Sequence, residues 1–278
     1  MKIKSNLKST RKGEEDAYSS FEQRVDKDKE SYYFHQPCIE FPIIDKNKQV
    51  VVDIVEQMHD AMKGCGIGLA HNQYPKAENA TNPYAIFIIE ARDVPFEVFI
   101  NPVIVGYTEE KVGFYHGCLS ALGYESAKVA TYKEVLIAFY AEDLKTLQVK
   151  KFADFASVIC QHEFNHLTTK GTYVDTIYNH VNGNHELAKD FFSTDEQIKS
   201  DKRRYSLDTV SDDIPCLIPS NILSKCKKYL NENKLYNDAV DDYLISHPED
   251  KPLYEQLSNL PDTQLPLYGE VIPHHSES

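Results

Sequence analysis

The sequence of 278 residues lacks several features that mark whole classes of protein. No apolar run approaches the roughly 18 residues of a membrane-spanning helix, and the polar opening segment, MKIKSNLKSTRKGEED, lacks the apolar stretch of a secretory signal. Basic residues are also scarce, because 30 Lys and Arg stand against 43 Asp and Glu. A protein that binds nucleic acid needs a basic face to replace the counterions of the phosphates. We therefore expect no specific nucleic-acid partner, no membrane partner and a cytoplasmic location.

Paired cysteines are absent as well. The six cysteines stand at positions 38, 65, 118, 160, 216 and 226, and no two of them form a CxxC pair. They are scattered through a long chain rather than concentrated in a small disulfide scaffold. This distribution indicates a reducing compartment.

Three zones differ in composition along the chain. Residues 1–32 are rich in Lys, Glu, Ser and Asp with almost no apolar periodicity, which predicts a mobile N-terminal tail. Residues 33–180 have the composition of a globular domain. From residue 181 to residue 278 the apolar density falls, and the segment PSNILSKCKKYLNENK predicts a helix with Ser220 as its N-cap. We expect this zone to form an acidic, mostly helical C-terminal extension whose partner is unknown.

The globular zone predicts an α+β fold. In NKQVVVDIVEQMHDAMKG, Val51, Val55 and Met58 recur at helical spacing before Gly64 ends the helix. The segments YAIFIIEA, FEVFINPVIVGY and EVLIAFYA are short and rich in β-branched and aromatic residues, as strands are. A second helix is expected to begin near Asp154. This order differs from the regular βαβ alternation of a parallel sheet.

The segment CQHEFNHLTTKG places a His-Glu-x-x-His motif on the second predicted helix. Helical residues four apart project from one face, so His162 and His166 can hold one metal ion between them. Glu163 lies beside them, within reach of a water bound to that ion. The apolar run just upstream, which includes Val158 and Ile159, favours a packed helix over a surface helix with two free histidines.

A third ligand is needed, because catalytic zinc sites usually combine three protein ligands with one water. The segment FYHGCLSALG offers Cys118 after a glycine that permits close backbone approach. The segment GCGIGLAHNQ offers a glycine-rich loop that ends in Gln73. Taken separately, the cysteine is a buried thiol and the loop is a helix stop and turn. Taken together with the two histidines, they need a further explanation.

These three segments, in this order, resemble the motifs of the peptide deformylase family. The family carries G-x-G-L-A-A-x-Q, E-G-C-L-S and Q-H-E-x-D-H-L, and the matching segments here are GIGLAHNQ, HGCLS and QHEFNHL. The resemblance covers about residues 40–178. It implies antiparallel and mixed β-sheets around a central HExxH helix, in a catalytic domain at residues 33–180. It implies nothing about the C-terminal extension.

Carried over by position, the resemblance implies one divalent metal ion, Fe²⁺ or Zn²⁺ with Ni²⁺ or Co²⁺ as substitutes, and a metal-bound water that attacks the substrate. The implied metal ligands are Cys118, His162 and His166. Glu163 is the implied general acid/base. The implied donors to the oxyanion are the side-chain amide of Gln73 and the backbone N–H of Leu119.

The implied substrate is the formyl group on the N-terminal methionine of a peptide or nascent chain. Val158 and Ile159 match positions that line the family's methionine pocket. The backbone of Ile67 and Gly68 matches positions that pair with the peptide strand. The resemblance therefore predicts a formyl-removing hydrolase.

Five residues depart from the family pattern. His116 stands in place of Glu, Thr131 in place of Arg, Asn165 in place of Asp, and His71-Asn72 in place of a pair such as Ala-Pro. Loss of the Glu and the Arg together removes a charged pair without stranding one charge. Residues two apart on an extended segment face the same side, so His116 can point toward the metal together with Cys118. It is then an outer hydrogen-bonding residue, a competing ligand, or a tolerated replacement in a relaxed cleft.

Two other functions remain open. A thermolysin-type metalloprotease takes a downstream Glu as its third ligand, and NGNHELAKD supplies Glu186, but this interpretation leaves GIGLAHNQ and HGCLS without a role. A deformylase-like pseudoenzyme would keep the metal and bind a peptide or small molecule without turnover. The losses at His116 and Thr131 favour a binding protein, whereas the intact Glu163 and Gln73 favour an enzyme.

Overall fold

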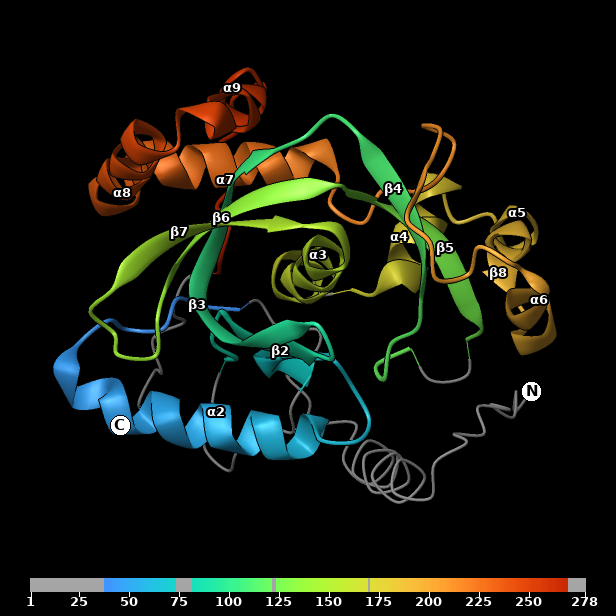
Figure 1. Ribbon diagram of the computed structural model, residues 1–278, viewed down its shortest axis with the longest axis horizontal. Helices are drawn as coiled ribbons and strands as arrows, with labels where there is room; N and C mark the ends of the chain where they lie inside the picture. The colour runs from blue at the N-terminus through green and yellow to red at the C-terminus, as the bar shows by residue number, and fades with distance from the viewer. Residues whose placement is uncertain (1–37, 74–81, 122–123, 170, 270–278) are drawn as a thin grey trace, which may run out of the picture.

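The computed structural model describes residues 38–73, 82–121, 124–169 and 171–269 (Figure 1). The tail predicted for residues 1–32 lies outside these residues. Within them, strands and helices combine in two antiparallel sheets and several packed helices, which confirms the α+β fold class. In the same part of the chain, no helix is long and apolar enough to cross a membrane.

Helix α3 (Asp154–Thr169) is the central element of the molecule, and it begins where the sequence predicted. Figure 1 shows it near the middle, seen almost along its axis and surrounded by strands. Most of its side chains are buried, polar ones included, so each buried polar group on it needs a partner or a task. Gln161, for example, accepts a hydrogen bond from Tyr132 N at 2.9 Å and donates one to Tyr132 O at 2.7 Å. These two bonds fix α3 against strand β5 (Ser126–Tyr132).

The larger sheet has five strands in the order β1-β2-β3-β6-β7, all paired antiparallel. Its strands are β1 (Gly68–Ala70), β2 (Ile86–Ala91), β3 (Val94–Tyr107), β6 (Glu134–Tyr140) and β7 (Leu147–Ala153). Helix α2 (Lys48–Met62) buries Val51, Val55 and Met58 against this sheet, as its apolar spacing predicted. The short β1 leads directly into the 3₁₀ turn η3 (His71–Gln73), so the glycine-rich loop ends at the edge of the sheet.

The smaller sheet has four strands in the order β8-β5-β4-β9. Strand β4 (Lys111–His116) pairs with β5 along its whole length. The outer strands β8 (Phe192–Ser193) and β9 (Asp208–Thr209) come from the last third of the chain. The predicted C-terminal extension therefore adds strands to the sheet that holds β4.

The remaining α-helices lie after α3. They are α4 (Tyr173–His180), α5 (His185–Ala188), α6 (Asp195–Ser200), α7 (Ser220–Glu232), α8 (Lys234–Ser246) and α9 (Lys251–Ser258). The other 3₁₀ turns are η2 (Asp45–Asn47), which precedes α2, and η4 (Lys189–Phe191) and η5 (Pro248–Asp250), which follow α3. The prediction of Ser220 as an N-cap is wrong by one residue, because Pro219 is the N-cap and Ser220 begins α7. Helices α7 and α9 pack against β3, and Leu223 and Leu230 of α7 are buried in the same apolar cluster as Phe99 of β3. A boundary between separate units at residue 180 stays a prediction.

Asn101 lies at an irregularity of β3, where the pairing with β6 shifts between Ile100 and Val103. Its φ is 50°, in the left-handed region that Asn tolerates better than most residues. Its Oδ1 accepts from Phe41 N at 2.7 Å, and its Nδ2 donates to Phe41 O at 2.9 Å. Tyr236 of α8 donates its hydroxyl to Asn101 O at 2.7 Å. We call Asn101 and these partners the Asn101 cluster.

Candidate metal centre

Three side chains from two parts of the chain converge beside α3. Cys118 follows β4 after one glycine, and His162 and His166 lie one turn apart on α3. A ligand atom from each of the three lies within 4.8 Å of the other two. The Cys118 Sγ and His166 Nε2 atoms are 3.3 Å apart, near the roughly 3.5 Å expected between a sulfur and a nitrogen that share a tetrahedral ion. The residues that the sequence singled out as ligands are therefore brought together.

His166 is held in one orientation by its neighbours. Its Nδ1 bonds to Gly171 O at 2.8 Å, so Nδ1 carries the proton and Nε2 faces Cys118. Asn72 donates its Nδ2 to His166 O at 2.7 Å. Asn165, which stands where the family has Asp, accepts from Thr169 Oγ1 at 2.9 Å. These bonds order the last turn of α3, so the second ligand is preorganised.

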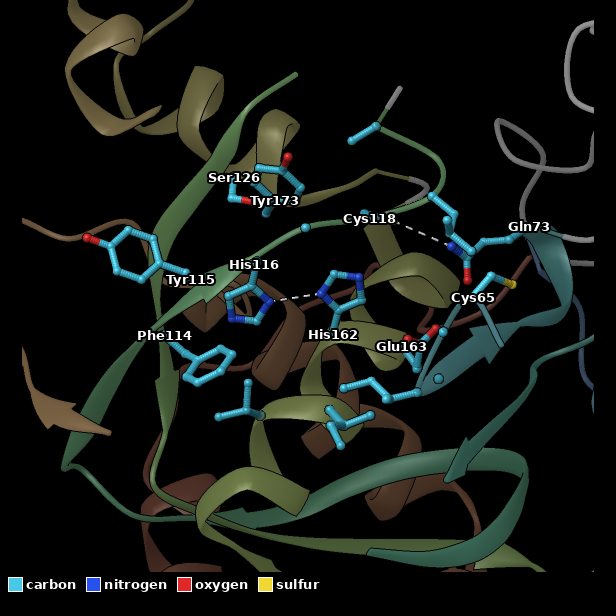
Figure 2. A pocket seen from close by; sticks show the side chains of 18 of the residues that line it. Cys65, Gln73, Phe114, Tyr115, His116, Cys118, Ser126, His162, Glu163 and Tyr173 are labelled. Carbon is cyan, nitrogen blue, oxygen red and sulfur yellow. Dashed lines mark hydrogen bonds between the residues drawn. The ribbon is translucent and has the colours of Figure 1, made fainter. Parts of the chain in front are cut away.

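His162 is held from the other side by His116. The two Nδ1 atoms are 2.9 Å apart, and the two ring planes differ by only 1° (Figure 2). His116 is 4% exposed. In the part of the chain that the structure describes, the group with ligand geometry contains Cys118, His162 and His166 and not His116. His116 therefore bonds to His162 and lies outside the group with ligand geometry.

Gln73 approaches the cysteine from the opposite side (Figure 2). Its Oε1 accepts from Ala70 N at 2.8 Å, which turns the amide nitrogen toward the site. That nitrogen lies 3.1 Å from Ser120 Oγ and 3.5 Å from Cys118 Sγ. The glycine-rich loop and the cysteine segment thus meet at one place, as the sequence predicted.

Glu163 is buried and lies against the backbone of β1. A Cβ built on Gly68 would stand 2.8 Å from the Glu163 Cδ atom, closer than real atoms approach. Glycine at position 68 therefore makes room for this carboxyl, which is a role that sequence reasoning did not identify. Among the described residues, no group bonds to Glu163 Oε2.

Burial dominates the electrostatics of these side chains. It lowers the pKa of His162 to about 4 and the pKa of His166 well below its usual value, so both rings are neutral, the form that binds metal. Burial also raises the pKa of Glu163 well above its usual value and that of the Cys118 thiol to about 12. A bound divalent cation reverses such a shift and takes the thiol as a thiolate. The donor set, one cysteine and two neutral imidazoles, fits a transition metal.

A cavity of about 590 Å³ opens beside these residues. The predicted substrate residues Ile67, Gly68, Val158 and Ile159 all line it, together with Leu119, Gln73, His162 and Glu163. Sequence reasoning missed five aromatic lining residues: Phe114, Tyr115, Tyr124, Phe155 and Tyr173. The spacing of two of them could have revealed them. Phe114 is two residues before His116 on a strand, and Phe155 is about one turn before Val158 on a helix, so each faces the same side as a residue that the sequence singled out.

Two departures from the family motifs leave uncharged, buried groups. Thr131 on β5 is fully buried, and no described residue bonds to its Oγ1. His71 accepts a hydrogen bond from Tyr84 N at 2.9 Å, and burial lowers the pKa of its ring to about 4. Both side chains are therefore part of the packed interior rather than of the cavity wall.

Glu186 does not join the metal group. It lies on α5, its side chain is 82% exposed, and it pairs with Lys189 at 2.7 Å. In the described chain, the third residue beside the two histidines is Cys118. The protease alternative therefore loses its third ligand.

Known proteins resemble this chain over the region that holds the site. A sequence model of the family described as polypeptide deformylase matches residues 24–182. The peptide deformylase of Fusobacterium nucleatum is 35% identical over 126 residues, which are 45% of this chain and 66% of the relative. The peptide deformylase of Cellvibrio japonicus is 32% identical over 155 residues, 51% of this chain and 85% of the relative. A crystal structure of a probable peptide deformylase from Synechococcus phage S-SSM7 shares 26% identity, with a TM-score of 0.43 over 51% of this chain and 91% of that one.

Proposed function

Because this chain belongs to the polypeptide deformylase family, we propose that it removes the formyl group from the N-terminal formylmethionine of peptides or nascent chains. The family membership predicted from the three motifs is confirmed by the match over residues 24–182. The observation that carries the proposal is the group of Cys118, His162 and His166 beside buried Glu163, whose Oε2 has no partner among the described residues. This combination provides a group able to hold a metal, a base and a cavity at one place.

We propose that Cys118, His162 and His166 hold one divalent ion, Fe²⁺ or Zn²⁺, with Ni²⁺ or Co²⁺ as substitutes. Thiolate and imidazole donors suit all four metals. When bound, the ion supplies a Lewis acid for the formyl carbonyl and an activated water. The neutral state of both imidazoles supports this assignment, since only an unprotonated nitrogen can bind a metal.

Glu163 carries the protons. Its carboxyl takes a proton from the attacking water and delivers it to the departing amine, so one residue acts first as base and then as acid. Two features support this role: no described residue bonds to Oε2, and the carboxyl lies at the cavity wall. Burial raises the pKa of Glu163, which suits a group that must hold a proton between two steps.

Gln73 and Leu119 are the proposed donors to the oxyanion that forms on the attacked carbonyl. The Gln73 amide is anchored through Oε1 by Ala70 N, so its nitrogen points into the site without rearrangement. Leu119 would contribute its backbone N–H. Loss of one such donor typically costs about 10²–10³ in rate.

The apolar wall of the cavity suits a methionine side chain. Val158 and Ile159 lie one turn before His162, and the rings of Phe114 and Phe155 are 5.2 Å apart between centroids on the same wall. Aromatic rings attract the polarisable sulfur of a thioether. The backbone of Ile67 and Gly68, at the edge strand β1, is the proposed partner of the peptide strand.

The test is formate release from formyl-Met-Ala-Ser by protein purified without oxygen and loaded with Fe²⁺ or Ni²⁺. We expect turnover that disappears in Glu163→Ala and in Cys118→Ser. Glu186→Ala is the matched control, because this glutamate is exposed and lies outside the group of Cys118, His162 and His166, and turnover should persist.

The second candidate is a binding protein, and the departures at His116 and Thr131 favour it. In the same experiment, a binding protein would hold one equivalent of metal tightly and bind the formyl peptide, but it would release no formate. That result would overturn the proposed hydrolase.

A further inference from the structure

His116 has an unusual set of contacts for a buried histidine. It ends β4, two residues before Cys118, and its Nδ1 lies 2.9 Å from His162 Nδ1. Its other nitrogen, Nε2, is buried, and none of the described residues bonds to it. Figure 2 shows the two rings edge to edge, with Cys118 and Gln73 on the far side of His162. Among the described residues, His162 is therefore the one hydrogen-bond partner of this imidazole.

Each ring nitrogen of a neutral imidazole either carries a proton or has a free lone pair, and this rule fixes the position of the protons on His116 and His162. His162 bonds to His116 through Nδ1, so Nε2 is the nitrogen left to bind a metal. A neutral imidazole that binds metal through Nε2 carries its proton on Nδ1. The partner of that proton must be an acceptor. His116 therefore presents an unprotonated Nδ1 and keeps its own proton on Nε2.

We propose that His116 is a positioning residue: an uncharged hydrogen-bond acceptor that orients His162 toward the ion. The inference rests on the metal centre of the proposed function. An outer partner of this kind fixes the ring orientation and the tautomer of a metal-binding histidine. A neutral acceptor draws the His162 proton less strongly than a carboxylate, so the ion keeps more of its Lewis acidity.

The same inference accounts for Thr131. A buried carboxylate at position 116 would require a compensating positive charge, because an unpaired buried charge costs several kcal/mol. A neutral imidazole has no such requirement. Thr131 is fully buried and uncharged, and it faces the same side of the sheet as His116, because Thr131 pairs with Val112 and His116 pairs with Ala127. The two departures are then one change, from a charged pair to a neutral acceptor.

Two substitutions separate hydrogen bonding from packing. In His116→Asn the side-chain oxygen occupies nearly the place of the histidine Nδ1, so the acceptor is kept and the ring is lost. In His116→Phe the ring is kept, beside Phe114 at its 6.1 Å centroid distance, and the acceptor is lost. A positioning role and a packing role therefore predict opposite results.

The measured quantity is the affinity for Zn²⁺, from competition with a chromophoric chelator. We expect His116→Phe to bind Zn²⁺ about 10- to 100-fold more weakly than the unchanged protein, and His116→Asn to bind nearly as tightly. Weak binding by the Asn variant with normal binding by the Phe variant would overturn the inference. Thermal melting of each metal-free variant checks that both are folded.

A second measurement needs no variant. In the Zn²⁺-loaded protein, nitrogen-15 NMR of the imidazole rings should show His162 protonated on Nδ1 and His116 protonated on Nε2 alone. A proton on His116 Nδ1 would overturn the inference even if a variant failed to fold. No Zn²⁺ binding by the unchanged protein would instead overturn the metal centre itself, so the two failures are distinguishable.

Discussion

Two buried polar clusters of this molecule differ in how completely their groups are paired. In the Asn101 cluster, the backbone N–H, the carbonyl and both side-chain atoms of Asn101 have partners within 2.9 Å. Around the metal group, by contrast, His116 Nε2, Glu163 Oε2 and Asn72 Oδ1 are buried without a partner among the described residues. Both clusters lie in the packed interior, so burial alone does not explain the difference.

The difference indicates that buried polar groups have two distinct roles in this molecule. A fully paired cluster stabilises one arrangement of the backbone, whereas an unpaired buried atom costs free energy unless a ligand or a reaction uses it. The Asn101 cluster joins the segment at Phe41, strand β3 and helix α8, which are distant in the sequence. His116 and Glu163, by contrast, line a cavity, and each keeps a buried atom that has no partner among the described residues. We therefore expect substitutions in the first cluster to change stability and those in the second to change chemistry.

Removal of the C-terminal helices should have the largest effect. A chain that ends at residue 180 loses β8, β9 and the whole of α7, whose Ile222, Leu223 and Leu230 are at most 3% exposed. Burial of each such side chain contributes about 1.5–3 kcal/mol, which together rivals a total stability of about 5–15 kcal/mol. We expect no cooperative thermal transition by circular dichroism. A cooperative transition with intact metal binding would establish residues 33–180 as an independent domain.

Asn101→Ala should have the next largest effect. The substitution strands the Phe41 N–H and carbonyl, at about 1–3 kcal/mol each, and adds about 1–2 kcal/mol for a left-handed alanine. Chemical denaturation measures the sum, which we expect at about 3–8 kcal/mol, with Zn²⁺ affinity unchanged. Asn101→Gly is the control, because glycine accepts the φ of 50° and should recover the backbone part alone. Equal losses in both variants would contradict this division.

Glu163→Gln should stabilise the metal-free protein while it abolishes turnover. Burial raises the pKa of Glu163 in the folded state, so its contribution is full below about pH 4.5 and is lost as the pH rises toward the folded-state pKa. The gain on substitution should therefore grow as the pH rises above about 4.5, by about 1.4 kcal/mol for each unit of pKa shift. Melting temperatures in the presence of chelator measure it. Glu186→Gln, at an exposed carboxyl, should show no such gain, and a pH-independent gain at position 163 would refute the explanation.

Thr131→Val should have the smallest effect, and in the stabilising direction. The valine keeps the shape and removes a buried hydroxyl that has no described partner, which is worth about 1 kcal/mol. Thr108→Val is the control, in the turn that follows β3: its Oγ1 accepts from Glu134 N at 3.1 Å and donates to Glu110 O at 3.2 Å. This control should lose stability. A loss at position 131 as well would reveal a partner for its hydroxyl.

The sequence predicted the metal group because its geometry is local. Helix periodicity alone brings His162 and His166 to one face, and the resemblance supplied Cys118. The elements that the sequence did not predict form by pairing with strands that are distant along the chain. Strands β8 and β9 have two residues each, too few for any alternation, and they exist only because β5 and β4 offer free edges. The contact between His116 and His162 was one of three open interpretations, since it depends on how a strand lies against a helix 46 residues later.

Two tyrosines of the C-terminal region bond to residues far earlier in the chain, and this separation affects how the protein folds. Tyr236 bonds to a carbonyl 135 residues earlier, and Tyr268 bonds to Pro102 O across 166 residues. Contacts so distant along the chain give a high contact order, which slows folding because long loops must close before the contacts form. During synthesis, β3 leaves the ribosome long before α8 exists. The strands that α7, α8 and α9 cover therefore stay exposed until these helices have been made.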